Sequence, residues 1–151
     1  HWAAKNGFGT SVTLTENGED ADPQRFAFAE QNEREARDRI AGAVFATDTD
    51  LTHPIAFGIG LDDMPVHRDM ETFFEKHSDP YATVAAYKDN ALISGYASPE
   101  NREKMAGTPA IIAERFGQGS VILFADNPAF RGYWMGTHKL VMNAVYFSRG
   151  F

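Results

Sequence analysis

The chain has 151 residues and a formal net charge of −7, and 43% of its residues are hydrophobic. This length and apolar content are typical of one folded domain, so we treat residues 1–151 as a single domain. The acidic charge disfavours nucleic-acid binding. The chain contains no cysteine, which excludes disulfides, thiolate-rich zinc sites and cysteine nucleophiles. No apolar run approaches the roughly 18 residues that span a bilayer.

The first forty residues predict little of the core. Residues 1–9 have the pattern of a helix end, residues 11–15 alternate like a strand, and Asp22-Pro23 is a helix start. The charged segment 24–40 predicts a solvated surface helix, although an arm that docks on another domain or subunit is the alternative. Its expected i,i+4 ion pairs are Glu30/Arg34, Glu33/Arg37 and Glu35/Arg39.

The middle of the chain predicts short strands. Apolar runs at 42–45, 73–74, 83–87 and 93–96 are strand candidates, whereas the polar run from Thr47 to Pro54 resembles a turn. A helix is expected from Ser98 to Met105, with a stop at Gly107.

The last third gives the clearest pattern. Residues 109–115 and 120–125 predict a hairpin that turns at Gly117-Gln118-Gly119, and residues 137–148 predict a helix. The apolar stripe expected to pack on the sheet consists of Leu140, Val141, Ala144 and Val145. Together the elements predict an α/β domain with a mixed sheet.

The sequence offers no set of catalytic residues. None of the five histidines begins an H-x-x-E motif, and there is no G-x-S-x-G elbow. The densest polar cluster is Asp48, Asp50 and His53, which could bind a divalent cation, but an Asp/Thr-rich turn before Pro54 explains it more simply. We therefore expect neither enzymatic activity nor a metal site in this chain.

One loop combines residues that anchor ligands or interfaces. It follows the strand at 120–125, where open α/β sheets usually bind ligands, and its notable residues are Asn127, Phe130, Arg131, Trp134 and Thr137. The loop is either a binding surface or a structural corner. We favour the corner, with Trp134 largely buried and Arg131 bonded to a carboxylate or carbonyl.

At this loop the sequence resembles a known family. The stretch GQGSVILFADNPAFRGYWMGTHKLVMNAVYF resembles the end of the C-terminal domain of bacterial zinc-carboxypeptidase-like proteins of the carboxypeptidase A type. The resemblance covers roughly residues 38–148. The matching positions are Asp126, Asn127, Pro128, Phe130, Arg131, Gly132, Trp134, Gly136, Thr137, Leu140, Asn143 and Ala144.

The resemblance implies a flavodoxin-like sandwich of the class I glutamine amidotransferase kind, incomplete at the N-terminus. Amidotransferases carry H-P-E where this chain has Asp126-Asn127-Pro128, so the triad histidine is missing together with the cysteine. The implied role is a non-catalytic accessory domain for domain docking, dimerisation or substrate recognition. Zinc would belong to an N-terminal peptidase domain outside this chain.

The partners and the location also follow from the resemblance. The expected partner is that peptidase domain or a second subunit, in a periplasmic or secreted protein. The alternative function is a degenerate hydrolase or small-ligand domain that uses Asp50, His53 and Arg131.

Overall fold

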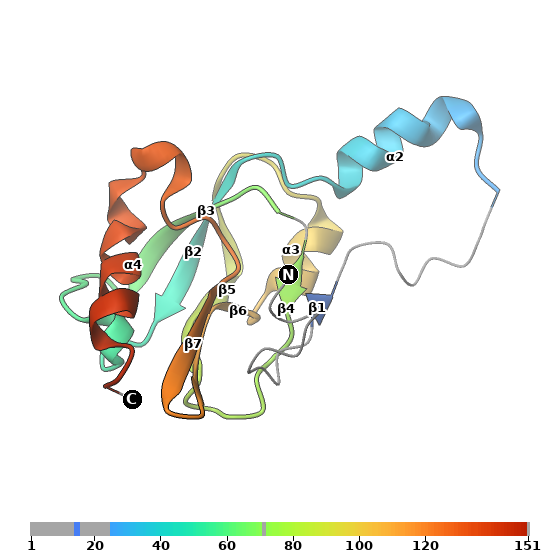
Figure 1. Cartoon of the computed structure of the whole chain (residues 1–151). Helices are drawn as coiled ribbons and strands as arrows, with labels where there is room; N and C mark the ends of the chain where they lie inside the picture. The colour runs from blue at the N-terminus through green and yellow to red at the C-terminus, as the bar shows by residue number, and fades with distance from the viewer. Residues whose placement is uncertain (1–13, 16–24, 71, 151) are drawn as a thin grey trace.

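The computed structural model describes residues 14–15, 25–70 and 72–150. Five strands form one antiparallel sheet in the order β3-β2-β5-β6-β7, and a short ribbon pairs β1 with β4 (Figure 1). The strands are β1 (Leu14–Thr15), β2 (Ala43–Thr49), β3 (Asp63–Arg68), β4 (Phe73–Phe74), β5 (Thr83–Ser94), β6 (Pro109–Phe116) and β7 (Gly119–Phe124). The helices are α2 (Gln31–Asp38), α3 (Pro99–Met105) and α4 (Met135–Phe147), with 3-10 turns η1 (Phe28–Glu30), η2 (Pro54–Ala56) and η3 (Phe130–Gly132).

This arrangement confirms the α/β class but not the flavodoxin-like fold. Flavodoxin-like sheets are parallel, whereas every pairing between the described strands is antiparallel. The mixed sheet expected from the sequence is likewise not found in the described part of the chain.

The two central strands are longer than their apolar runs. β5 joins the separate candidates 83–87 and 93–96 into one strand, with register shifts against both of its neighbours. β2 continues into the polar run because Thr47 and Thr49 alternate inward. The Thr47 hydroxyl donates to the Met64 carbonyl at 2.9 Å, so its burial leaves no donor unpaired.

Strand β3 was not predicted from the sequence. Pro65 lies at its centre, opposite Ala46 of β2, and proline lacks the N–H that a central strand needs. β3 tolerates it because it is the last strand on one side of the sheet.

Local sequence signals correctly predicted the β6–β7 hairpin and the start of α3. The hairpin of β6 and β7 turns at Gly117, whose φ of 60° favours glycine. Helix α3 starts as expected, since the Ser98 hydroxyl accepts the Asn101 N–H at 3.1 Å.

Helix α4 packs on one face of the sheet through a different stripe from the predicted one. Leu140 is 0% exposed and Ala144 packs on the core, but Val145 is 69% exposed. Asn143 is buried instead, and its Nδ2 donates to the Ile55 and Phe57 carbonyls, each at 2.8 Å. These bonds fasten α4 to the η2 turn.

The charged segment forms an arm that projects from the opposite end of the molecule to α4 (Figure 1). The predicted solvated helix is confirmed for its described part, because residues 25–36 are all exposed, but α2 covers only Gln31–Asp38. Glu30 and Arg34 pair at 3.3 Å. Arg39 follows the helix end in extended backbone, so the Glu35/Arg39 helical pair is not formed, and Glu35 accepts from Gln31.

Three N-terminal predictions lie wholly or partly outside the described residues. These are the helix end at 1–9, the helix start at Asp22-Pro23 and most of the strand at 11–15, of which Leu14–Thr15 form β1. The Arg37 side chain is also not described, so the Glu33/Arg37 pair stays a prediction.

Candidate functional site

A buried polar cluster joins the end of β3, the middle of β5 and the residue that follows Ala125 after β7. Arg68 Nη1 donates to Asp126 Oδ1 and to the Tyr87 hydroxyl oxygen, each at 2.9 Å. The Tyr87 hydroxyl donates to Asp126 Oδ2 at 2.5 Å, and Arg68 Nη2 also donates to the Thr72 carbonyl. Both carboxylate oxygens of Asp126 are thus engaged directly before the loop that starts at Asn127.

Burial dominates the electrostatics of this cluster. It raises the pKa of Tyr87 well above the ordinary value, so the phenol stays protonated and can donate to Asp126. Burial also raises the pKa of the Asp126 carboxyl, and the charge of Arg68 opposes that increase. Arg68 is 0% exposed, so this is a charge pair in the interior rather than a surface salt bridge.

The raised pKa of Tyr87 predicts alkaline destabilisation. In the unfolded chain Tyr87 loses its proton near pH 10, while in the folded chain it keeps it. The unfolded state then binds fewer protons, so the free energy of unfolding falls above pH 10, by up to about 1.4 kcal/mol per pH unit from this residue. Urea titrations of wild type and Tyr87→Phe between pH 9 and about 11 measure the difference in slope.

The exposed Tyr146 provides the matched control. Tyr146→Phe is expected to keep the wild-type slope, and Tyr87→Phe to reduce it. Equal slopes for Tyr87→Phe and wild type would show that Tyr87 ionises as freely in the folded chain as in the unfolded one.

An aromatic stack lies beside the cluster. His67 is buried and stacks on Phe130, with ring centroids 3.7 Å apart, and Trp134 lies 5.9 Å from the same imidazole. Trp134, which was expected to be largely buried, is half-buried, and its indole nitrogen is buried with no partner among the described residues.

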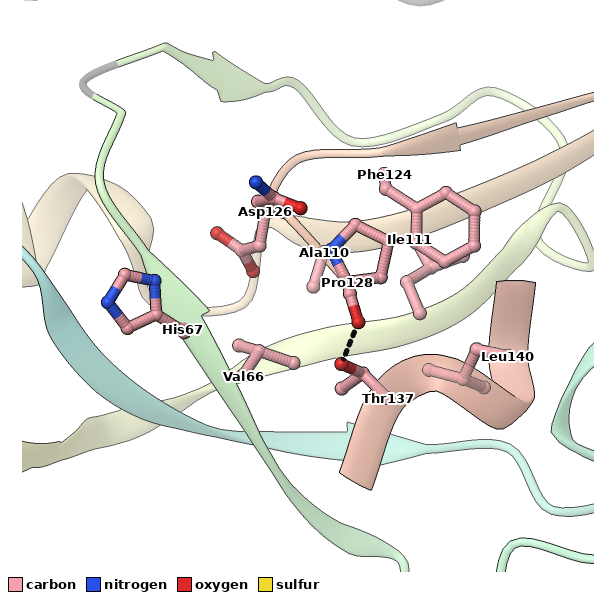
Figure 2. A pocket seen from close by; sticks show the side chains of 10 residues that line it. Val66, His67, Ala110, Ile111, Phe124, Asp126, Pro128, Thr137 and Leu140 are labelled. Atoms are coloured by element: carbon pink, nitrogen blue, oxygen red, sulfur yellow. Dashed lines mark hydrogen bonds between the residues drawn. The ribbon is translucent and has the colours of Figure 1, made fainter. Parts of the chain in front are cut away.

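Beneath this loop is a small cavity. Figure 2 shows the side chains of β3, β6 and α4 around it. Its volume is about 10 Å³, which is room for roughly one water molecule. The lining is mainly apolar, with Val66, Ile111 and Leu140 among its residues. Apolar cavities of this size stay dry, so we do not assign it a ligand.

Arg131 does not have the expected role. Its side chain is exposed, and its guanidinium lies 5.1 Å from the centroid of the Phe130 ring. The backbone of Arg131 has φ 50°, in the left-handed region. The arginine bonded to a carboxylate at the sheet end is Arg68, so Arg131→Ala would leave no buried partner unpaired.

Asn127 and Thr137 have local structural roles. Asn127 is exposed, and its Oδ1 accepts the Ala129 N–H at 3.1 Å. The Thr137 hydroxyl donates to the Pro128 carbonyl at 2.5 Å, as Figure 2 shows. Because α4 begins at Met135, Thr137 lies inside the helix and holds it to the loop instead of capping it.

The polar cluster at 48–53 is occupied by turn contacts. Asp50 Oδ1 accepts from the Thr52 N–H at 2.9 Å and from its hydroxyl at 2.6 Å, and these bonds lower the pKa of Asp50. His53 Nδ1 accepts the Ile55 N–H at 3.1 Å at the start of η2, and burial lowers the pKa of His53. Asp48 is exposed on β2.

The described residues hold neither a metal-binding group nor a helix that could cross a membrane. Within residues 14–15, 25–70 and 72–150, no three histidine, aspartate or glutamate side chains are grouped to hold a metal ion. Across the same residues, no helix has the length and apolar character needed to cross a membrane.

Comparison of the chain with protein-family models, with curated proteins and with solved structures gives no match. The chemical interpretation therefore depends on the residues themselves.

The sequence analysis named none of the three residues of the buried cluster as a site residue, and Asp126 entered only as a position that matches the resembled family. Asp126 could be noticed because it ends an apolar strand, but Arg68 and Tyr87 lie 58 and 39 positions from it in the chain. The local signal for Arg68 is weak: it is a charged residue two positions after the short apolar run that ends at Val66.

Proposed function

We propose that this chain is a non-catalytic accessory domain of a zinc-carboxypeptidase-like protein, and that it acts by docking. The resemblance of its last thirty residues supports the family, and a periplasmic or secreted location is part of the same proposal. The non-catalytic role is supported indirectly by the polar residues of the alternative hydrolase site, which have other contacts or are exposed. Asp50 and His53 accept bonds in a turn, and Arg131 is exposed on the loop before α4.

The observation that carries the docking role is the outer side of α4. Met135, Met142, Val145 and Tyr146 are 70%, 51%, 69% and 73% exposed, and we call these four residues the α4 face. At 3.6 residues per turn they lie within one side of the helix, opposite Leu140 and Ala144. Exposed apolar side chains that share one side of a helix, here with the partly buried His138 among them, are typical of interaction sites.

The neighbouring η2 turn extends this surface. Phe57 is 64% exposed and packs edge-to-face on Phe147, with ring centroids 5.4 Å apart. Lys139 lies at the edge of the α4 face that is nearest the η2 turn, and its Nζ donates to the Gly58 carbonyl at 2.8 Å. An apolar surface with a cationic group is suited to a protein partner that is apolar at its centre and acidic at its edge.

Activity assays of the purified chain and the sequence of its upstream reading frame test this proposal. We expect no release of C-terminal residues from peptides and no glutamine hydrolysis, and we expect an H-x-x-E motif in the reading frame upstream of His1. Turnover that persists through purification to homogeneity and resists a chelator would contradict the non-catalytic role. An upstream frame without a metallopeptidase domain would contradict the family.

A further inference from the structure

The arm carries a second apolar surface that has no partner within the described chain. Phe26 is 46% exposed and Phe28 is 89% exposed. A groove of about 390 Å³ runs beside them, lined by Phe26, Ala27, Phe28, Gln31, Arg34 and Glu35. The guanidinium of Arg34 lies 3.6 Å from the centroid of the Phe26 ring and forms one wall.

The helix of the arm is too short to be stable alone. α2 has eight residues, preceded by three in η1, and isolated helices shorter than about 12–15 residues are marginal in water. Tertiary packing normally supplies the missing stability, but the described side chains of residues 25–36 are all exposed. The arm therefore has the properties of an element that packs on another molecule.

The arm and the α4 face do not meet within one copy. They project from opposite ends of the sheet, with the sheet between them (Figure 1). Each is an exposed apolar surface. The arm has the groove beside Phe26 and Phe28, and the α4 face has the exposed side chain of Tyr146. Two copies can satisfy both surfaces at once by exchanging arms, which closes a symmetric dimer.

Charge favours this pairing over the direct pairing of two α4 faces. Residues 127–151 contain Arg131, Lys139 and Arg149 but no aspartate or glutamate, although the whole chain has a net charge of −7. Two α4 faces would place cations against cations. Residues 25–36 of the arm carry three glutamates (Glu30, Glu33 and Glu35) and two arginines (Arg25 and Arg34), so the arm meets the cationic side of α4 with a small net negative charge instead of a second set of cations.

We propose that the arm of one copy docks on the α4 face of a second copy, and reciprocally, with Tyr146 entering the groove beside Phe26 and Phe28. This inference uses the docking surface of the proposed function and names its occupant: the residues 25–36 of another copy of this chain.

Sedimentation velocity of the chain from low micromolar to ~100 µM tests the proposal. Wild type is expected to dimerise. Phe28→Asp alters only the arm and Tyr146→Asp only the α4 face, and each is expected to weaken the dimer at least about tenfold. Tyr81→Asp is the matched control, because Tyr81 is 85% exposed and lies outside both surfaces.

Mixing the two variants gives the decisive result. Phe28→Asp keeps an intact α4 face and Tyr146→Asp keeps an intact arm, so only the heterodimer has one contact without a substitution, and the mixture is expected to associate more tightly than either variant alone. Both positions are exposed, so both variants are expected to fold, which circular dichroism and the urea midpoint check.

Several outcomes would overturn the inference. These are a monomeric wild type at ~100 µM, a dimer that survives either variant, or a mixture that associates no more tightly than either variant alone. If the wild type is monomeric but the α4 face is protected within the parent protein, the arm exchange fails while the proposed docking function stands.

Discussion

Replacing Asp126 with alanine is expected to lower the free energy of unfolding by about 3–5 kcal/mol. The change leaves the Arg68 guanidinium, which is 0% exposed, without its carboxylate in the interior. It also removes the acceptor of the Tyr87 hydroxyl. Urea denaturation with a constant m-value measures the loss.

Two comparisons isolate the cause. Asp63→Ala removes the carboxylate of an exposed pair with Lys88 and should cost about 1 kcal/mol or less. The triple change of Asp126→Leu, Arg68→Met and Tyr87→Phe should recover much of the stability, because apolar groups of similar volume can replace a buried charged network. A loss below about 1 kcal/mol for Asp126→Ala would mean that water reaches the cluster.

Leu140→Ala should cost about 2–5 kcal/mol, because Leu140 is 0% exposed and packs in the main core beside the cavity under α4. Enlarging a site that already borders an empty space favours the upper part of this range. The same denaturation measurement applies.

Val145→Ala is the matched control on the same helix. The sequence placed Leu140 and Val145 on one packing stripe, whereas the structure leaves Val145 69% exposed. We expect Val145→Ala to change stability by less than about 0.5 kcal/mol. Equal losses of stability at Leu140 and Val145 would mean that Val145 packs on the sheet as the sequence predicted, and that the α4 face is not exposed.

Elements with local signals could be predicted from the sequence. The β6–β7 hairpin follows from glycine in its turn, and α3 follows from Ser98 and Pro99 at its start. The solvation of α2 follows from its charge pattern. In each case the residues that determine the structure are within a few positions of one another.

Features that depend on distant residues could not be predicted. β3 contains Pro65 and is a strand only because it lies at the sheet edge. Thr47 and Asn143 are polar yet buried, and their hydrogen-bond partners come from elsewhere in the fold. The cluster around Asp126 requires three elements to meet, so Arg131, which is close in sequence, was a more obvious candidate than Arg68.

Methionine oxidation tests the docking role of α4 most directly, when the isolated chain is compared with the chain within its parent protein. Met135, Met142 and Met70 are 70%, 51% and 43% exposed, whereas Met64 and Met105 are 3% and 1% exposed. Peroxide should oxidise the first three in the dilute isolated chain and spare the buried two. Within the parent, the account predicts that Met135 and Met142 become protected while Met70 stays reactive. Unchanged oxidation of Met135 and Met142 in the parent would contradict it.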